Sequence, residues 1–309
     1  MEQNYVALKD RRLNHIILPG THNSAIDRVN YSIPLGNKTY NNLRKLAKYV
    51  KPIGNFIYKW TVNQYFTIEE QLKTGVRLFD LRVTYIERED KFYLSHTFMS
   101  IELCNVLEQI VKFMGENQKE VIMLKFSYDY EYKNNSNFHT IKFMDILYKY
   151  LDKLVFTKND TISMSDILPY YSEMVEKNKR IILLHDYLDY HNFEIFWTNK
   201  YVRSKWLNVN NVIDFEKNMY IEMKQIARNN VNINLLQFIL TPQISDIKND
   251  LLNPFSDESL DTMASKLKNY AIPKIFDNHV DDIPKISGIF VDYIDVDVIR
   301  YIITLNHVS

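Results

Sequence analysis

Short apolar runs recur along the chain, and a stretch with the periodicity of a helix follows most of them. Strand-like length and residue types are found in runs 15–18, 77–86, 92–96, 121–126, 180–184, 234–240 and 288–293. Helical periodicity is found in stretches 68–74, 100–117, 138–155, 257–270 and 295–303. Strands that alternate with helices in this way predict a mainly parallel sheet, either closed into a barrel or open and doubly wound.

Two local signals set boundaries in this pattern. Thr67 and Glu70 have the spacing of a capping box, and Gly75 suits the position just after a helix, so we expect a helix over 68–74. Pro19 and Gly20 are expected to stop the first strand at position 18. No internal repeat and no linker rich in proline and glycine divides the chain, so we predict a single α/β domain over residues 1–309.

Composition narrows the range of functions. Lys and Arg number 38, as do Asp and Glu, so no overall charge attracts nucleic acid and we expect no nucleic-acid partner. The 6 glycines form neither a G-x-G-x-x-G fingerprint nor a P-loop, which disfavours a Rossmann fold and a nucleotide cofactor. The single cysteine, Cys104, excludes an internal disulfide and a cysteine-rich metal site, and we expect it to be a buried structural thiol.

The sequence carries no sign of a membrane-spanning or secreted protein. Residues 1–12 are polar and charged, without the apolar core of a signal peptide. No apolar run approaches the roughly 18 residues that a transmembrane helix needs. We therefore expect a cytoplasmic protein.

Polar or ionisable residues end nearly every apolar run. They are His22 and Asn23, Asp80 and Arg82, His96, Lys125, His185 and Asp186, Thr241 and Asp292. The carboxyl ends of parallel strands meet at one rim, and that rim carries the chemistry in βα architectures. Asp80 and Arg82 are two apart, so both point to the same face of their strand. We therefore predict that these side chains converge on one site.

The residue types at this rim suit phosphoryl transfer. Two histidines on separate strands provide a general base and a general acid near neutral pH. Arg82 offers a permanently charged fork that matches the oxygens of a phosphate. Asp292 is suited to hold a histidine in one tautomer and to stabilise its charged form.

At these residues the sequence closely resembles the X-region of the phosphatidylinositol-specific phospholipases C, especially the bacterial enzymes and the small X-domain-only proteins. Five motifs match in the family's order: Leu18-Pro-Gly-Thr-His-Asn-Ser24, Gly75-Val-Arg-Leu-Phe-Asp-Leu-Arg82, Tyr93-Leu-Ser-His96, Val121-Ile-Met-Leu-Lys125 and Phe290-Val-Asp-Tyr293. They cover the first 127 residues and the last strand, whereas residues 130–285 match loosely apart from Leu240-Thr-Pro242. The resemblance implies a distorted TIM-type barrel.

The resemblance also implies a reaction and assigns roles in it. Phosphatidylinositol is cleaved to diacylglycerol and inositol 1,2-cyclic phosphate when the inositol 2-hydroxyl attacks its own phosphate. His22 would be the base with Asp292 behind it, His96 the acid, and Arg82 the group that neutralises charge in the transition state. Asp80 supports this catalytic set. Substrate-binding positions are expected at Asn23, Lys125, His185 and Asp186.

Two departures from the family pattern bear on the mechanism. Calcium-dependent members carry carboxylates where this chain has Arg82 and Lys125, and cations there would repel Ca²⁺, which needs about 6 oxygen ligands. We therefore expect a metal-independent enzyme without a cofactor. Bacterial members usually carry Asp where this chain has Asn23, which keeps open a catalytically weak or inactive homologue that binds inositol lipids or phosphates.

Other phosphodiesterase barrels, of the glycerophosphodiesterase or spider-venom sphingomyelinase type, are a further alternative. These enzymes hold Mg²⁺ with a pair of carboxylates on the second strand. Arg82 stands where the second carboxylate would be, which makes this alternative the least favoured.

A long insertion follows the first strand, at about 28–66. Within it, Arg28 to Ile68 contains seven basic residues and no Asp or Glu, and aromatic residues gather at its end. Basic charge beside aromatic side chains suits an anionic membrane surface. We expect transient contact with anionic phospholipid through Lys45, Lys48, Lys51, Phe56, Tyr58 and Trp60.

Overall fold

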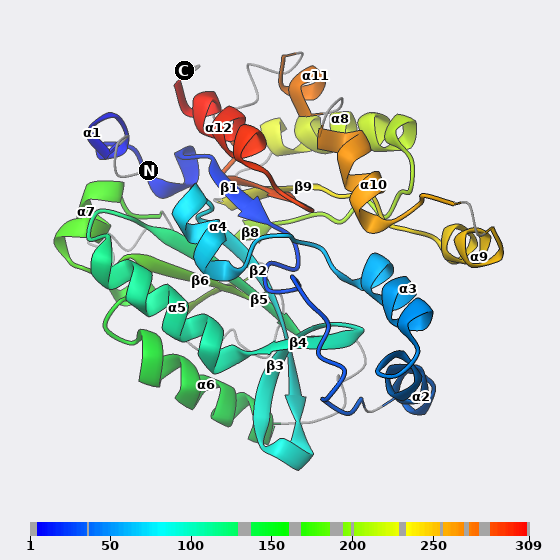
Figure 1. Cartoon of the computed structure of the whole chain (residues 1–309). Coiled ribbons are helices and arrows are strands. Elements are labelled where there is room, and N and C mark those ends of the chain that lie inside the picture. Colours follow the sequence, from blue (N-terminus) through cyan, green and yellow to red (C-terminus); the bar gives the residue numbers. More distant parts are fainter. Residues whose placement is uncertain are drawn as a thin grey trace.

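The apolar runs pair as strands in the structure, a computed structural model that describes residues 5–35, 37–128, 137–160, 168–185, 194–198, 201–228, 233–253, 256–268, 272–277 and 285–307. Within these ranges, eight strands lie parallel in the order β7-β6-β5-β2-β1-β10-β9-β8 and curl into a nearly closed barrel (Figure 1). They are β1 (Leu18–Thr21), β2 (Leu78–Ile86), β5 (Ile122–Tyr128), β6 (Ile181–His185), β7 (Phe196–Thr198), β8 (Val202–Arg203), β9 (Ile233–Phe238) and β10 (Gly288–Val291). The predicted distorted TIM-type barrel is confirmed.

Helices surround the barrel (Figure 1). They are α1 (Tyr5–Leu8), α2 (Lys38–Ala47), α3 (Lys51–Thr61), α4 (Ile68–Thr74), α5 (Leu103–Glu116), α6 (Asn137–Leu151), α7 (Tyr171–Glu176), α8 (Val212–Arg228), α9 (Ile244–Leu252), α10 (Leu260–Lys266), α11 (Ile272–Asp277) and α12 (Val296–Thr304). The predicted start of α4 is confirmed, because Thr67 and Glu70 form a reciprocal capping box. Gly75 ends this helix with a φ of 118°, a value that side-chain-bearing residues rarely adopt.

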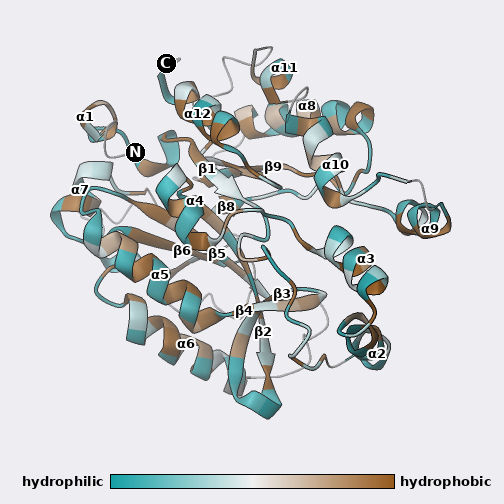
Figure 2. Ribbon diagram, in the orientation of Figure 1, coloured by the Kyte–Doolittle hydropathy of each residue, from teal (hydrophilic) through white to brown (hydrophobic). Residues whose placement is uncertain are grey.

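Alternation along the strands separates two apolar layers. On β2, Phe79 and Leu81 pack with the helices, whereas Leu78 belongs to a second cluster inside the barrel. Figure 2 shows the apolar strands between helices whose outer faces are polar. The residues two and four positions after Leu78 are Asp80 and Arg82, so the interior face of β2 is apolar below and charged toward its carboxyl end.

Two predicted boundaries, the end of the first strand and the start of the helix expected over 100–117, were wrong. β1 does not end at Leu18 but runs through Pro19 and Gly20, where the proline carbonyl accepts a hydrogen bond from Arg77 N at 2.9 Å. The expected helix over 100–117 begins only at Leu103, because residues 98–102 form β4 (Phe98–Glu102). This strand pairs antiparallel with β3 (Lys91–His96), and the hairpin turns at Thr97, whose φ is 64°.

The insertion between β1 and α4 contains α2 and α3 (Figure 1). Its buried side chains form a small core of their own against β2, β3 and β4, made of Ile33, Leu35, Ala47, Ile57, Ile86, Tyr93, Phe98 and Met99. The end of α3 is attached to α9 by Asp250, which accepts hydrogen bonds from Lys59 Nζ at 2.6 Å and from Trp60 Nε1 at 2.8 Å. The insertion is thus fastened to both sides of the barrel mouth.

We expect Gly20→Ala to destabilise the protein, because β1 runs too close to its neighbours for a side chain. An added Cβ would lie 2.8 Å from the Ile289 carbonyl oxygen and 2.8 Å from Leu78 Cδ2. Overpacking of this kind costs about 1–3 kcal/mol, measurable by denaturant unfolding. Gly115→Ala is the matched control: nothing lies within 4 Å of its added Cβ, and alanine in helix α5 should stabilise by up to about 1 kcal/mol. Equal effects of the two substitutions would contradict this packing account.

Candidate active site

The turn after β1 directs His22 toward the barrel mouth. Asn23 has a φ of 45°, a left-handed conformation that asparagine tolerates better than most residues. Ser24 fastens the turn to β2, since its Oγ accepts from Asp80 N at 2.8 Å and its own N–H donates to the Asp80 carbonyl at 2.9 Å. The position of His22 is therefore set by hydrogen bonds between two neighbouring strands.

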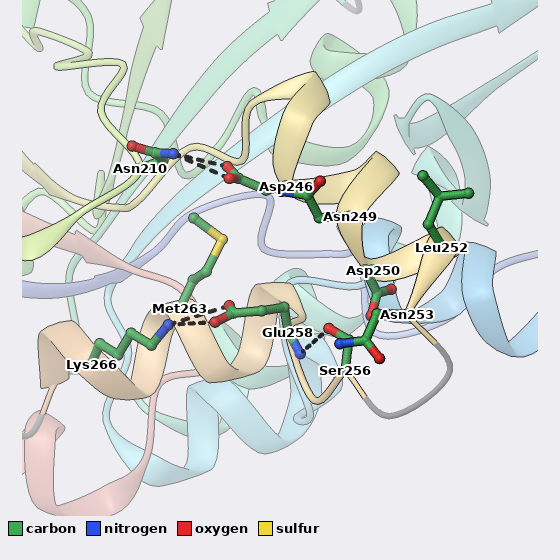
Figure 3. A pocket seen from close by; sticks show the side chains of 10 residues that line it. All are labelled: Asn210, Asp246, Asn249, Asp250, Leu252, Asn253, Ser256, Glu258, Met263 and Lys266. Atoms are coloured by element: carbon green, nitrogen blue, oxygen red, sulfur yellow. Dashed lines mark hydrogen bonds and ion pairs between the residues drawn. The ribbon is translucent and has the colours of Figure 1, made fainter.

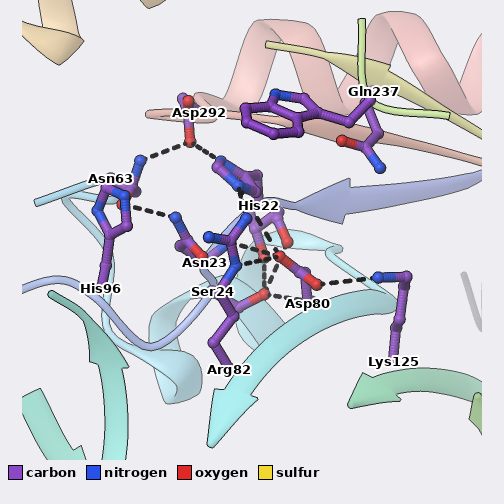
Figure 4. Close-up of polar contacts among 12 residues, drawn as sticks. His22, Asn23, Ser24, Asn63, Asp80, Arg82, His96, Lys125, Gln237 and Asp292 are labelled. Atoms are coloured by element: carbon purple, nitrogen blue, oxygen red, sulfur yellow. Dashed lines mark hydrogen bonds and ion pairs between the residues drawn. The ribbon is translucent and has the colours of Figure 1, made fainter. Parts of the chain in front are cut away.

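His22 is hydrogen-bonded through both ring nitrogens (Figure 4). Its Nδ1 lies 2.8 Å from Asp292 Oδ1, and its Nε2 lies 2.8 Å from Arg82 Nη2. A guanidinium nitrogen can only donate, so Nε2 accepts and the proton of the neutral ring sits on Nδ1, facing the carboxylate. The lone pair of a general base is thus presented on Nε2, on the side of Arg82.

Asp80 is the buried anion at the centre of the site. Burial by itself would raise the pKa of its carboxyl, but the charges of Lys125, then Arg82 and His22, outweigh burial and lower it to about 2. Lys125 Nζ lies 3.5 Å from Oδ1, and Arg82 Nε lies 3.8 Å from Oδ2, which also accepts from Asn23 N at 3.2 Å. Asp80 therefore stays charged at neutral pH and holds both cations in place.

His96 reaches the site from the β3–β4 hairpin. Its Nδ1 lies 2.9 Å from the Thr61 carbonyl oxygen, which can only accept, so Nδ1 carries a proton. When the ring is charged, its second proton is on Nε2. Figure 4 shows His96 among the side chains drawn around His22.

Sequence reasoning missed two buried amides, Asn63 and Gln64, which directly follow the insertion helix α3. Asn63 Nδ2 donates to Asp292 Oδ1 at 3.0 Å. Gln64 Nε2 donates to the carbonyls of His22 at 2.8 Å and of Val291 at 3.0 Å. Only the three-dimensional arrangement reveals them, because consecutive polar residues after a helix read as an ordinary loop.

The structure brings most of the predicted site residues together and leaves His185 apart from them. His22, Asn23, Asp80, Arg82, Lys125 and Asp292 lie together in one hydrogen-bonded cluster. His185 instead lies buried between the rings of Tyr128 and Phe196, and burial, followed by the charge of Lys125, lowers the pKa of its imidazole to about 3. It is a neutral core residue in this position. Asp186 lies outside the described residues.

The carboxylates at this site do not fit a calcium ion. Asp80 already faces Lys125 and Arg82, and Asp292 accepts from His22 and Asn63. Among the residues that the structure describes, no group of three or more His, Cys, Asp or Glu side chains is placed to hold a metal.

A second polar cluster, between α9 and α10, lines a pocket outside this site (Figure 3). Its acidic groups are each matched: Asp246 accepts from Asn210, Glu258 pairs with Lys266, and Asp250 pairs with Lys59. Mutual pairing gives these groups a structural role, and Asp250 in particular links α9 to the insertion helix α3.

The expected membrane residues differ in where they lie. Lys45, Lys48, Lys51 and Tyr58 are exposed and Phe56 is half-buried. Trp60 is buried with its Nε1 bonded to Asp250, so it belongs to the interior and not to the outer surface. Across the described ranges, no helix has the length and apolar character needed to cross a bilayer.

Comparison with known proteins places this chain in a family. The family model described as PI-PLC X 1 matches residues 38–270, more than half of the chain. The chain belongs to the PI-PLC X family. The match begins after His22 and ends before Asp292, so these two partners lie outside the matched range.

Relatives and solved structures agree with this assignment. PI-PLC X domain-containing protein 2 of Homo sapiens is 24% identical over 242 residues, 78% of this chain and 76% of that protein. A PI-PLC X-box domain-containing protein of Dictyostelium discoideum is 32% identical over 148 residues, 48% of this chain but only 19% of that protein. The phosphatidylinositol-specific phospholipase C of Listeria monocytogenes has the same fold, with a TM-score of 0.67 at 16% identity over 96% of this chain and 95% of that one.

Asp80 should make the stability of this PI-PLC X family member sensitive to acid. The pKa of Asp80 in the folded protein is about 2, below the ordinary value of 3.8. The ionised carboxylate therefore stabilises the folded state fully above pH 3.8, and this stabilisation is lost as the pH falls toward about 2. We expect Asp80→Asn to have a lower free energy of unfolding than wild type at pH 7. This difference should shrink by about 2 kcal/mol as the pH falls from 3.8 toward 2. Denaturant unfolding at several pH values checks this. A gap that does not change with pH would contradict the ionic role of Asp80.

Proposed function

We propose that the protein is a phosphatidylinositol-specific phospholipase C-like phosphodiesterase that cleaves phosphatidylinositol-type lipids without a metal ion. The observation that carries the proposal is the arrangement around His22: Asp292 on Nδ1, and an Nε2 lone pair beside Arg82. A base whose tautomer is set and whose lone pair faces a phosphate-binding cation suits attack of a hydroxyl on a neighbouring phosphate.

In the proposed reaction, the inositol 2-hydroxyl takes the place of Arg82 Nη2 at the lone pair of His22 Nε2. Arg82 turns to the phosphate, and Nε2 takes the proton of the hydroxyl. The hydroxyl oxygen then bonds to phosphorus, and the bond from phosphorus to the diacylglycerol oxygen breaks. His96 gives that departing oxygen a proton, so the products are diacylglycerol and inositol 1,2-cyclic phosphate. Arg82 neutralises the charge that builds on the phosphate oxygens, and Lys125 and Asp80 hold Arg82 and the turn after β1 in place.

One observation favours a second candidate, a binding protein with little or no activity. Position 23 carries an amide, and Asn23 Nδ2 is engaged with Asn63 Oδ1 at 3.0 Å. The site therefore lacks the extra carboxylate that the bacterial pattern places there. Such a protein would bind an inositol phosphate or inositol lipid through Arg82 without cleaving it.

The proposed partner is an anionic phospholipid surface, which the protein touches through α2, α3 and α9. Lys45, Lys48 and Lys51 are exposed, and exposed apolar side chains lie on or next to the same helices: Leu43 and Leu46 on α2, Tyr49 between α2 and α3, Tyr58 on α3, and Leu251 and Leu252 on α9. These helices lie beside the barrel mouth (Figure 1). Lysines with exposed leucines and tyrosines are suited to hold the mouth against lipid headgroups.

Incubation with phosphatidylinositol vesicles in EDTA tests the reaction. We expect wild type to release inositol 1,2-cyclic phosphate in the presence of EDTA, and His22→Ala to be slower by about 10²–10⁴-fold, since it lacks the base. Product that forms only with added Ca²⁺ would overturn metal independence. Vesicle binding by wild type without any product would favour the binding protein instead.

Sedimentation with phosphatidylserine-containing vesicles tests the membrane surface. Each lysine near an anionic surface contributes about 1 kcal/mol, so Lys45→Gln/Lys48→Gln should weaken binding about thirtyfold at low salt. Lys149→Gln/Lys153→Gln is the matched control, because these exposed lysines lie near the start of β6, at the opposite end of the barrel. Equal loss in both double variants would mean that binding is not directed to α2.

A further inference from the structure

The four residues Thr61 to Gln64 contact every part of the acid–base machinery. The Thr61 carbonyl bonds His96, Asn63 bonds the carboxylate of Asp292, and Gln64 bonds the backbone carbonyl of His22. The backbone of this segment is itself held, since Tyr293 N donates to the Asn63 carbonyl at 2.7 Å and Asn63 N donates to the Ile26 carbonyl at 2.9 Å. Asn63 is thus a fixed side chain at the back of the proposed base.

The hydrogen bonds of Asn63 allow one orientation of its amide. Asp292 Oδ1 accepts from His22 Nδ1, and Asn63 must turn its NH₂ group to that same oxygen. Asn63 Oδ1 then faces Asn23 and can only accept, so Asn23 must present its own NH₂ group, at 3.0 Å. The chain of donors runs in one direction, from Asn23 to Asn63 to Asp292.

Asn23 donates to Asn63 through its NH₂ group, and in this orientation its own side-chain oxygen is left without a hydrogen bond to any described residue. The residue is 1% exposed, and within the described residues its Oδ1 has no hydrogen-bond partner. A buried acceptor without a partner is rare in proteins and calls for an explanation. The demand of Asn63 for a donor at position 23 provides one.

We propose that Asn63 is a positioning residue for the His22–Asp292 pair and that Asn23 is the amide that keeps Asn63 in its working orientation. The inference deepens the proposed function and rests on it only where it names His22 as the base. It also gives a reason for the amide at position 23. In this chain a carboxylate there would oppose Asn63 rather than assist the reaction.

The conflict that a carboxylate would create follows from the same rules. An ionised aspartate at position 23 has no hydrogen to offer Asn63 Oδ1. Asn63 would have to turn over, which would place its oxygen against Asp292 Oδ1 and remove a donor from that carboxylate. Either the pair with His22 loosens, or the new aspartate takes up a proton from solvent.

Other charged groups around His22 remain the same in this comparison. Asp80 on β2 lies 4.0 Å from its Nε2, Arg82 on β2 bonds Nε2, and Asp292 follows β10. Lys125 on β5 acts through Asp80, and His96 on β3 is held by Thr61. A change in His22 in the uncharged variant Asn63→Leu therefore reports the hydrogen bonds of Asn63. Asn23→Asp acts on the same hydrogen bonds but also adds a carboxylate near Asp80.

The test uses four variants of the full chain and two readouts. Asn63→Leu removes the donor to Asp292. Asn23→Asp removes the donor to Asn63 Oδ1 and so favours the reversed orientation of the Asn63 amide, whereas Asn23→Ala leaves Asn63 free to keep its hydrogen bond to Asp292. Asn306→Asp is the matched control: this buried asparagine exchanges hydrogen bonds with the backbone of Ile17, away from His22. Its chemical change equals that of Asn23→Asp.

The first readout needs no substrate: ¹⁵N spectra of the imidazoles in histidine-labelled protein. We expect wild type, Asn23→Ala and Asn306→Asp to keep His22 in the Nδ1–H tautomer. Asn63→Leu and Asn23→Asp should add a mixture with the Nε2–H tautomer. An unchanged His22 spectrum in both of these variants, with the fold intact, would overturn the proposal. If Asn63→Leu does not fold, the spectrum of Asn23→Asp decides the result, because that substitution acts on the same hydrogen bonds from position 23.

The second readout is cleavage of phosphatidylinositol. Misplacement of a base should lower kcat by about tenfold to a hundredfold in Asn63→Leu and Asn23→Asp, and less in Asn23→Ala. A faster reaction in Asn23→Asp would overturn the inference, because a carboxylate would then assist at position 23. If wild type cleaves no inositol lipid, the proposed function fails, and the imidazole spectra still decide the role of Asn63.

Discussion

The site depends on one buried ionic interaction, the contact of Asp80 with Lys125 and Arg82. Two cations cannot occupy the mouth of an apolar barrel unless a nearby anion offsets the cost of removing them from water. Asp80 also binds the turn that carries His22, through its carboxylate to Asn23 N and its backbone to Ser24. The same residue therefore sets the charge of the site and the place of its base. Arg82, at 35% side-chain exposure, is the cation left open toward a ligand.

Much of the barrel and part of the site could be predicted from short-range patterns. Alternation on β2 predicts that Asp80 and Arg82 share the interior face with Leu78, and the structure agrees. The pairing of His22 with Asp292 follows from two strand ends meeting at one rim. The two-residue period of strands and the polar residues at their ends are local properties that a sequence expresses directly. They place residues on a face, but they do not say which side chains then bond.

The errors have a common physical cause, which is contact between distant parts of the chain. Trp60 carries the aromatic character of a membrane residue, but Asp250, 190 positions away, accepts its indole N–H and buries it. Asn63 gains its role only because Asp292 lies beside it in the fold. In both cases tertiary partners outweighed local preference. The hairpin at Thr97 is a local exception, because its turn needs a positive φ at a residue that is not glycine.

The attachment of α3 has a consequence for how this fold can vary in length. From the last turn of α3 onward the path is fixed within a few residues: Lys59 and Trp60 bind Asp250, Thr61 holds His96, and Gln64 holds His22. Upstream, the described residues between Arg28 and α2 make no comparable series of hydrogen bonds to the acid–base pair. Insertions and deletions should therefore be tolerated before α2 and rejected after Trp60. The part of the insertion before α2 can therefore change in length and surface, while the residues that follow Trp60 keep their positions relative to His22 and His96.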